Sequence, residues 1–248
     1  MPQRDVSITT PDGSLGASLH TPDGTGPWPA VIMYPDAGGV RPTFQDMAQR
    51  LADLGYAVLL PDPYYRLGEI APFDMKNVFN DEAERNRLMK LVGSVTKADA
   101  TTDTQAELDW LAAQPEVSSA KVGTTGYCMG GGMALNAAGR FPDRVGAAAS
   151  FHGGQIASTA PDSPHLLAGE MQAKVYVAGA EKDGSFDDEQ FERLQKALTE
   201  ADVDHTLVTY PALHGFAVPD NPTYDADAAA RHWQALEELY ASTLTTDS

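Results

Sequence analysis

Short apolar runs alternate with amphipathic segments along most of the chain, and this alternation strongly constrains the fold. The run Ala30–Tyr34 contains no charged residue, which is typical of a strand buried on both faces. A helical pattern follows from about Thr43, with an apolar stripe that reaches Leu54 and Gly55 as its end. Strands alternating with helices indicate a mainly parallel, doubly wound sheet with helices on both faces. We therefore predict an α/β fold.

The rest of the chain continues this pattern within a single predicted domain, residues 1–248. Residues 5–10 and 14–20 flank Pro11-Asp12-Gly13, a turn signal that predicts an antiparallel hairpin at the N-terminus. Residues 70–98 are less regular, and we expect either an insertion that forms a partial lid or a helix and loop packed on the scaffold. Further strands are predicted over 56–60, 121–125, 145–151, 174–178 and 205–210, and helices over 81–92, 102–114, 130–140, 187–201 and 225–244.

Composition excludes several classes of protein. The formal net charge of −18 should repel nucleic acid and anionic lipid. The single cysteine excludes an intrachain disulfide, and the sequence lacks both a signal-peptide pattern and an apolar run long enough to span a membrane. It also lacks a zinc-binding His-Glu-x-x-His motif and the glycine-rich motifs of nucleotide-binding proteins. We expect a cytoplasmic protein without a metal or cofactor, either a monomer or a small homo-oligomer.

Cys128 lies in the sequence Gly126-Tyr127-Cys128-Met129-Gly130, directly after a predicted strand and before a predicted helix. This is the nucleophile-elbow pattern with cysteine in place of serine. The tight turn holds the nucleophile where a substrate can reach it, and the flanking glycines allow neighbouring backbone to pack closely. The alternative interpretation is a buried, unreactive cysteine.

A thiol nucleophile needs a base to take its proton and an acid that orients the base. In a doubly wound hydrolase these residues follow the nucleophile in the order acid, then base, after successive strands. The predicted strand 174–178 is followed by Glu181 and Asp183, and either could be the acid. The predicted strand 205–210 is followed by His214, the candidate base.

These segments resemble the dienelactone hydrolases, also called carboxymethylenebutenolidases. The resemblance rests on Gly-Tyr-Cys-Met-Gly-Gly, the Gly-x-x-x-Asp loop and His-Gly-Phe, and it covers nearly the whole chain. It implies a single-domain α/β-hydrolase fold with Cys128 as nucleophile, Asp183 as acid and His214 as base. The oxyanion that forms during acyl transfer would be bound by the backbone N–H groups of Met129 and, by family position, Ala37.

Asp36 precedes the expected oxyanion donor, where the family typically has a glutamate close to the thiol. A negative charge there would oppose formation of a thiolate. Our hypothesis is that Asp36 restrains or directs Cys128 until substrate arrives. The alternative is an aspartate in a surface turn.

Substrate-binding residues are assigned from the resemblance. Arg66 is placed to hold a substrate carboxylate, although a surface ion pair is an equal alternative. Tyr65, His152 and Phe216 would lie near the mouth of the site, or serve only in packing. The family usually has a second arginine where this chain has Val218, so binding of small dianionic lactones should be weak.

The sequence therefore predicts a cysteine-dependent hydrolase of small esters or lactones that acts through an acyl-thioester, with a small molecule as its partner. A thioesterase or a carboxylesterase of the same fold is one alternative. A non-enzymatic protein that uses the thiol for redox sensing or binding is another.

Overall fold

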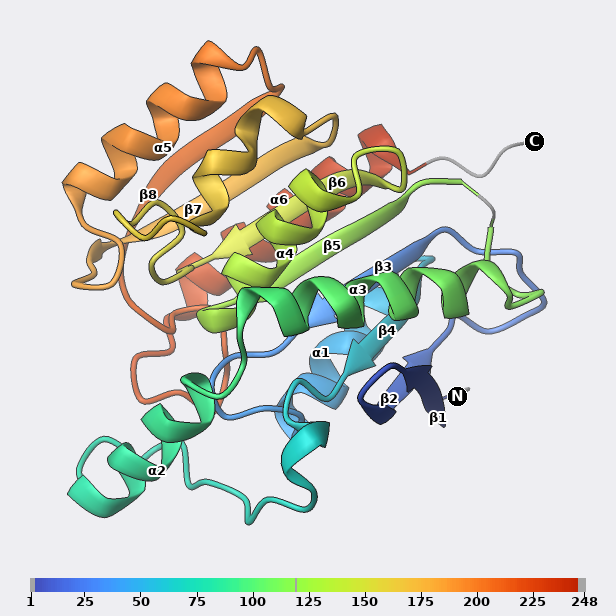
Figure 1. Ribbon diagram of the computed structural model, residues 1–248, viewed down its shortest axis with the longest axis horizontal. Coiled ribbons are helices and arrows are strands. Elements are labelled where there is room, and N and C mark those ends of the chain that lie inside the picture. The colour runs from blue at the N-terminus through green and yellow to red at the C-terminus, as the bar shows by residue number, and fades with distance from the viewer. Residues whose placement is uncertain (1–2, 119, 245–248) are drawn as a thin grey trace.

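An eight-stranded sheet runs through the centre of the protein in the computed structural model, which describes residues 3–118 and 120–244 (Figure 1). The strand order is β1-β2-β4-β3-β5-β6-β7-β8. β1 pairs with β2 and β2 with β4 in antiparallel fashion, and all other neighbouring strands are parallel. The predicted α/β sheet with its N-terminal hairpin is confirmed. The strands are β1 (Gln3–Thr10), β2 (Gly13–His20), β3 (Ala30–Tyr34), β4 (Ala57–Pro61), β5 (Val122–Tyr127), β6 (Val145–Phe151), β7 (Lys174–Lys182) and β8 (His205–Leu213).

Helices cover both faces of this sheet. The helices α3, α4 and α5 pack on the face seen at the front in Figure 1, and α1 and α6 pack on the other. Ile32 and Met33 of β3 show why the strand is apolar throughout, because one belongs to each core. In the described part of the chain no helix has both the length and the apolar character needed to cross a bilayer. The helices are α1 (Pro42–Ala52), α2 (Glu82–Val92), α3 (Lys97–Ala112), α4 (Met129–Arg140), α5 (Asp188–Glu200) and α6 (Ala226–Thr243).

Several boundaries differ from those predicted. The predicted helix 102–114 begins earlier, at Lys97, because Thr96 and Asp99 form a reciprocal capping box. β7 and β8 both continue past their predicted ends, since their pairing extends to Lys182 and Leu213. Leu54 was expected on the apolar stripe of α1, but it follows the helix and is 41% exposed.

The irregular segment 70–98 carries α2 and lies at the lower left of Figure 1. The side chain of Asp81 caps α2 by accepting hydrogen bonds from two backbone N–H groups of its first turn. Met75, Val78 and Leu88 form a small buried cluster, and Ala37 of the loop after β3 packs against it. This apolar contact attaches the segment to the end of the sheet where the carboxyl ends of the parallel strands lie.

A buried polar contact joins β3 to α3. The hydroxyl of Tyr34 donates a hydrogen bond to Glu107 Oε2 at 2.9 Å and lies 2.9 Å from Thr104 Oγ1. Burial raises the pKa of Glu107 from 4.5 to about 8; the bond from Tyr34 opposes the rise and the charge of Asp103 adds to it. The Glu107 carboxyl is therefore mostly protonated at neutral pH.

Replacing Glu107 with glutamine should make the stability less dependent on pH. Between pH 4.5 and about 8 the folded protein holds a proton on Glu107 that the unfolded chain has lost, so stability falls as pH rises through this window. The loss should be on the order of 3–5 kcal/mol, and Glu107→Gln should remove it. Urea unfolding of the wild type and of Glu107→Gln at pH 5 and at pH 8 measures the free energy of unfolding of each protein at the two pH values. The exposed Glu237→Gln is the matched control, and a pH dependence as steep in Glu107→Gln as in the wild type would contradict the assignment.

Candidate active site

Cys128 occupies a strained turn between the end of β5 and the first residue of α4. Its backbone angles are φ 54° and ψ −115°, a conformation that side-chain-bearing residues rarely adopt. A Cβ at Gly126 would lie 1.9 Å from the carbonyl oxygen of Gly130, and one at Gly130 would lie 2.3 Å from that of Tyr34. Both glycines of the elbow are therefore required by close backbone contacts.

His214 and Asp183 meet at the carboxyl end of the sheet, although they belong to different loops. His214 Nδ1 lies 2.7 Å from Asp183 Oδ2. The other oxygen of Asp183 accepts hydrogen bonds from the backbone N–H and hydroxyl of Ser185, at 2.8 and 2.6 Å. Glu181, the alternative acid, lies in β7 with an exposed side chain. Asp183 is therefore the acid in contact with His214.

The electrostatic environment favours a charged His214. Burial opposes the imidazolium, but hydrogen bonds with Asp183 and with the Cys128 side chain outweigh it and raise the pKa of His214 to about 10. Burial also opposes ionisation of Asp183, yet the hydrogen bond with His214 leaves the pKa of that carboxyl below its ordinary value. With Nδ1 engaged by Asp183, Nε2 is the nitrogen that remains for Cys128. The site thus places a positive charge beside the sulfur.

Two hydroxyl residues that the sequence did not single out support this pair. Ser185 holds Asp183 as described, and its Oγ also lies 3.3 Å from His214 Nδ1. Thr223 contacts the backbone carbonyl of His214 and lies 2.7 Å from Asn221 Oδ1. Serine and threonine are too common in loops for their positions to identify them from sequence.

A pocket of about 280 Å³ opens at Cys128 and His214. Ala37 and Asp36 line it on the side of the β3 loop, and His152 lines it at the end of β6. Met75 and Phe79 of the segment 70–98 also reach it. Within the described residues no lysine or arginine lines the pocket, so its wall supplies no ammonium or guanidinium group to a substrate.

Met129 and Ala37, the proposed oxyanion donors, lie at the start of α4 and in the loop after β3. Met129 is the first residue of α4, so its N–H has no partner within the helix. Ala37 lines the pocket, and its carbonyl oxygen accepts a hydrogen bond of 2.8 Å from the hydroxyl of Tyr64. Tyr64 therefore fixes the loop that carries Ala37, a role the sequence did not reveal.

Asp36 is buried, and its carboxylate is held by Arg41. Arg41 Nη1 and Nη2 donate to the two oxygens of Asp36 at 2.7 and 2.9 Å, and the N–H of Gly38 adds a third bond at 2.9 Å. The same guanidinium donates to both oxygens of Asp220, at 2.7 and 2.8 Å. This ion-pair network ties the β3 loop and the start of α1 to the segment that follows His214. Asp36 is therefore not the surface-turn aspartate of the alternative interpretation.

Replacing Arg41 with methionine should destabilise the protein by about 3–5 kcal/mol, because it leaves a buried carboxylate without its counter-charge. Chemical unfolding at neutral pH measures the loss. The double variant Asp36→Asn/Arg41→Met removes the stranded charge and should recover much of the stability. Equal stability of the single and double variants would contradict this account.

Three of the four residues proposed as substrate contacts do not line the pocket at Cys128. Arg66 pairs with Asp103 and Asp12, each at 2.7 Å, so the ion-pair alternative describes its position. Tyr65 packs beside it and hydrogen-bonds Asp103 at 2.9 Å. Phe216 and Val218 are fully buried in the core. Among these positions and His152, only His152 lines the pocket at Cys128.

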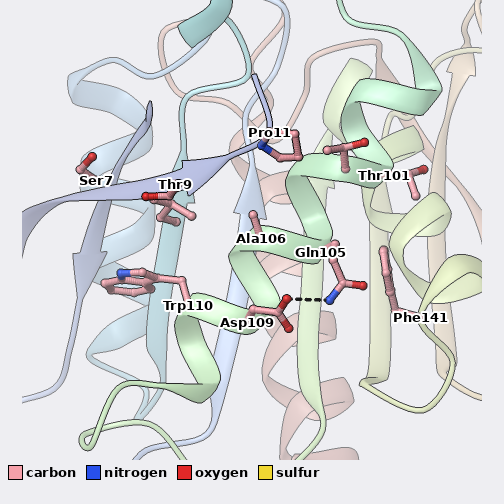
Figure 2. Close-up of a pocket in the computed structure, with 11 residues that line it drawn as sticks. Ser7, Thr9, Pro11, Thr101, Gln105, Ala106, Asp109, Trp110 and Phe141 are labelled. Carbon is pink, nitrogen blue, oxygen red and sulfur yellow. Dashed lines mark hydrogen bonds between the residues drawn. The ribbon is translucent and has the colours of Figure 1, made fainter. Parts of the chain in front are cut away.

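A larger hollow of about 710 Å³ lies between β1 and α3 (Figure 2). Ser7 and Thr9 line one side, and Trp110 lines the other. Gln105 donates a hydrogen bond of 2.9 Å to Asp109 within it. Its lining offers no nucleophile with an adjacent base, so the pocket at Cys128 is the candidate active site.

The chain is similar to known proteins over nearly its whole length. The model of the "Dienelactone hydrolase family" matches residues 15–244. A protein of Synechocystis sp. named as a candidate carboxymethylenebutenolidase is 29% identical over 96% of both chains. The structure of a candidate dienelactone hydrolase from Klebsiella pneumoniae superposes with a TM-score of 0.84, 25% identity and coverage of 97% of this chain and 98% of its own. That of P91 from metagenomic libraries, a dienelactone hydrolase-like promiscuous phosphotriesterase, gives 0.81, 29% identity and coverage of 98% and 99%.

Proposed function

The chain belongs to the dienelactone hydrolase family, and on this premise we propose that it hydrolyses small, uncharged esters and lactones with Cys128 as the nucleophile. One observation carries the proposal. Cys128 and His214 line one pocket, and His214 is hydrogen-bonded through Nδ1 to the buried Asp183. Cys128, Asp183 and His214 follow the chain order nucleophile, acid, base that is typical of hydrolases with this fold.

The first half of the reaction forms an acyl-thioester. The proton of the Cys128 thiol is transferred to His214, which gives the imidazolium and leaves a thiolate beside it, and this thiolate attacks the ester carbonyl carbon. The N–H groups of Met129 and Ala37 bind the negative oxygen of the tetrahedral intermediate. The bond from carbon to the leaving oxygen then breaks, and the imidazolium of His214 gives its proton to that oxygen.

The second half releases the acid. His214 takes a proton from a water molecule, whose oxygen attacks the thioester carbonyl. The carbon–sulfur bond breaks, and the sulfur leaves as a thiolate beside the imidazolium of His214, so the starting pair is restored. Asp183 holds the imidazole in one orientation through both halves, which keeps Nε2 directed at the reacting atoms.

The pocket favours substrates without a carboxylate. Its lining includes the negative side chain of Asp36 and, within the described residues, neither lysine nor arginine. Arg41 lies close by, but two carboxylates already occupy its guanidinium. A carboxylate in the pocket would lose its hydration without gaining a lysine or arginine as its partner, which is costly. This extends the sequence argument from Val218 and makes dienelactone itself a poor substrate.

A matched pair of esters tests this preference. p-Nitrophenyl crotonate and mono-p-nitrophenyl fumarate differ by a methyl group against a carboxylate, and the trans double bond prevents the carboxylate from attacking its own ester. We expect kcat/KM for the crotonate to exceed that for the fumarate by at least about tenfold, after each is divided by its uncatalysed rate. Faster turnover of the fumarate would overturn the proposed preference.

Three further substrates separate the alternatives on the same fold. A neutral lactone such as dihydrocoumarin should be hydrolysed, whereas an acyl-CoA should react slowly because its phosphates meet a chain with a net charge of −18. A neutral phosphotriester is included because P91, which shares this fold, is named for that activity. Rapid acyl-CoA cleavage would favour a thioesterase instead.

Two supporting roles belong to the same proposal. Asp36 directs Cys128 through its charge near the sulfur, and an unchanged reaction rate in Asp36→Asn would end that idea. The segment 70–98 acts as a partial lid, because Met75 and Phe79 line the pocket and Phe79 is 50% exposed. An incoming substrate would pass the half-exposed side chain of Phe79 on its way into the pocket.

A further inference from the structure

His152 follows β6 directly and occupies the wall of the pocket beside the candidate base. Its ring lies 5.1 Å from that of His214 and 5.0 Å from that of Phe216, edge to face in both cases. The side chain is fully buried, yet the residue lines the pocket that contains Cys128. A hydrogen bond of 2.8 Å from its backbone N–H to the carbonyl of Ala178 fixes the position of the residue.

Neither ring nitrogen of His152 has a hydrogen-bond partner among the described residues. Burial lowers the pKa of His152 well below its ordinary value, and the charges of His214 and His232 lower it further, although its own backbone acts in the opposite direction. The imidazole therefore stays neutral while His214 is charged. A neutral imidazole carries one N–H donor and one acceptor nitrogen.

This arrangement is unfavourable for the protein alone. A buried polar group without a partner is destabilising, and buried polar side chains are normally hydrogen-bonded. His152 also has φ 41°, a left-handed conformation that is strained for a residue with a side chain. Strain and an unsatisfied polar group at one pocket-lining residue indicate that the partner comes from a bound molecule.

We propose that His152 recognises an oxygen atom in the acyl part of the substrate, to which the N–H of its neutral ring donates a hydrogen bond. The acyl part is favoured over the leaving group by burial. The leaving group departs toward solvent, past the half-exposed Phe79, whereas the acyl group stays bound to Cys128 against the buried wall. The class of substrate is an uncharged ester or lactone with an ether, hydroxyl or oxo oxygen in its acyl chain. This inference rests on the proposed function.

Two nearly isosteric esters test the hydrogen bond. p-Nitrophenyl methoxyacetate differs from p-nitrophenyl butyrate by an oxygen in place of a methylene group. The ratio of their kcat/KM values is measured for the wild type, for His152→Phe, which removes the donor, and for His152→Gln, which keeps an N–H donor. Differences in intrinsic reactivity cancel when these ratios are compared between proteins.

We expect the preference for the methoxyacetate to fall about tenfold in His152→Phe and to be largely retained in His152→Gln. A purely structural role would slow both esters equally and leave the ratio unchanged, which would overturn the inference. A glutamine variant that behaves like phenylalanine would also overturn it. If turnover survives in Cys128→Ala, the proposed function fails; if turnover depends on Cys128 but the ratio is constant, only the role of His152 fails.

A binding measurement tests the same hydrogen bond even if a His152 variant does not fold. The Cys128→Ala protein is labelled with ¹⁵N-histidine, and ethyl methoxyacetate or ethyl butyrate is added. The ring nitrogen signals of His152 should shift with the methoxyacetate at concentrations where the butyrate leaves them in place. Unchanged signals with both esters, or the same shift with both, would contradict the hydrogen bond.

Discussion

Replacing Cys128 with alanine should lower kcat/KM for p-nitrophenyl crotonate by at least about 10⁴-fold, because the bond-forming atom is lost while the fold remains. The remaining oxyanion donors and the pocket would account for any residual rate. Cys128 is the single cysteine of the chain, so the wild type should also show a mass increase of one acyl group when it is quenched during turnover. The alanine variant should show none.

The control for this prediction is Ser242→Ala, an exposed substitution near the end of α6 that should leave the rate within about twofold. Thermal unfolding of all three proteins establishes that each is folded. Ester turnover that is unchanged in Cys128→Ala would refute the nucleophile assignment. An acyl adduct would in turn exclude the purely redox or binding role that the sequence left open.

Replacing Asp183 with asparagine should lower kcat by about 10³- to 10⁴-fold. The asparagine amide can donate to His214 Nδ1, which would stabilise the wrong tautomer of the ring and leave Nε2 protonated and unable to accept the thiol proton. Loss of the negative partner should also lower the pKa of His214 from about 10 toward its ordinary value. The pH profile of kcat/KM should therefore move toward lower pH as the rate falls.

Glu181→Gln is the matched control, since Glu181 is an exposed acid at the end of the same strand and was the alternative candidate. Its rate and pH profile should stay within about twofold of the wild type. A larger effect at Glu181 than at Asp183 would reverse the assignment. Rate loss in Asp183→Asn without any change in the pH profile would indicate a structural role for Asp183 alone.

The local features of the fold could be predicted because their physical causes lie within short stretches of chain. The uninterrupted apolar run Ala30–Tyr34 indicates burial on both faces whatever its neighbours are. Boundaries were less accurate where the cause was longer in range. β7 extends past residue 178 only because β8 pairs with it, and Leu54 was misplaced because helix α1 ends before it.

The candidate site, like the fold, could be predicted from the sequence only in part. The order Cys128, Asp183, His214 predicts a meeting point, since the carboxyl ends of parallel strands share one edge of the sheet. Side chains that act from other elements had no such signal. Tyr64, in the loop after β4, donates a hydrogen bond to the carbonyl of Ala37 in the loop after β3. That the ring of His152 lacks a hydrogen-bond partner is known only once all its neighbours have been placed.

The sequence by itself indicated the elbow at Cys128, because the Gly-x-Cys-x-Gly pattern is local and Gly126 is required by a contact with Gly130 in the same turn. The requirement for Gly130 comes from the tertiary structure, because the backbone of Tyr34 in β3 lies against it. The tertiary structure also decided which charges surround the elbow. Arg66, expected at the substrate, is bound by Asp12 and Asp103, whereas Arg41 binds Asp36 together with Asp220, 179 positions away in the chain. Ion pairs between distant residues depend on how the loops pack, and no spacing in the sequence encodes them. The packing therefore decides that neither lysine nor arginine is among the described lining residues of the pocket, and this absence leads to the uncharged substrate class that we propose.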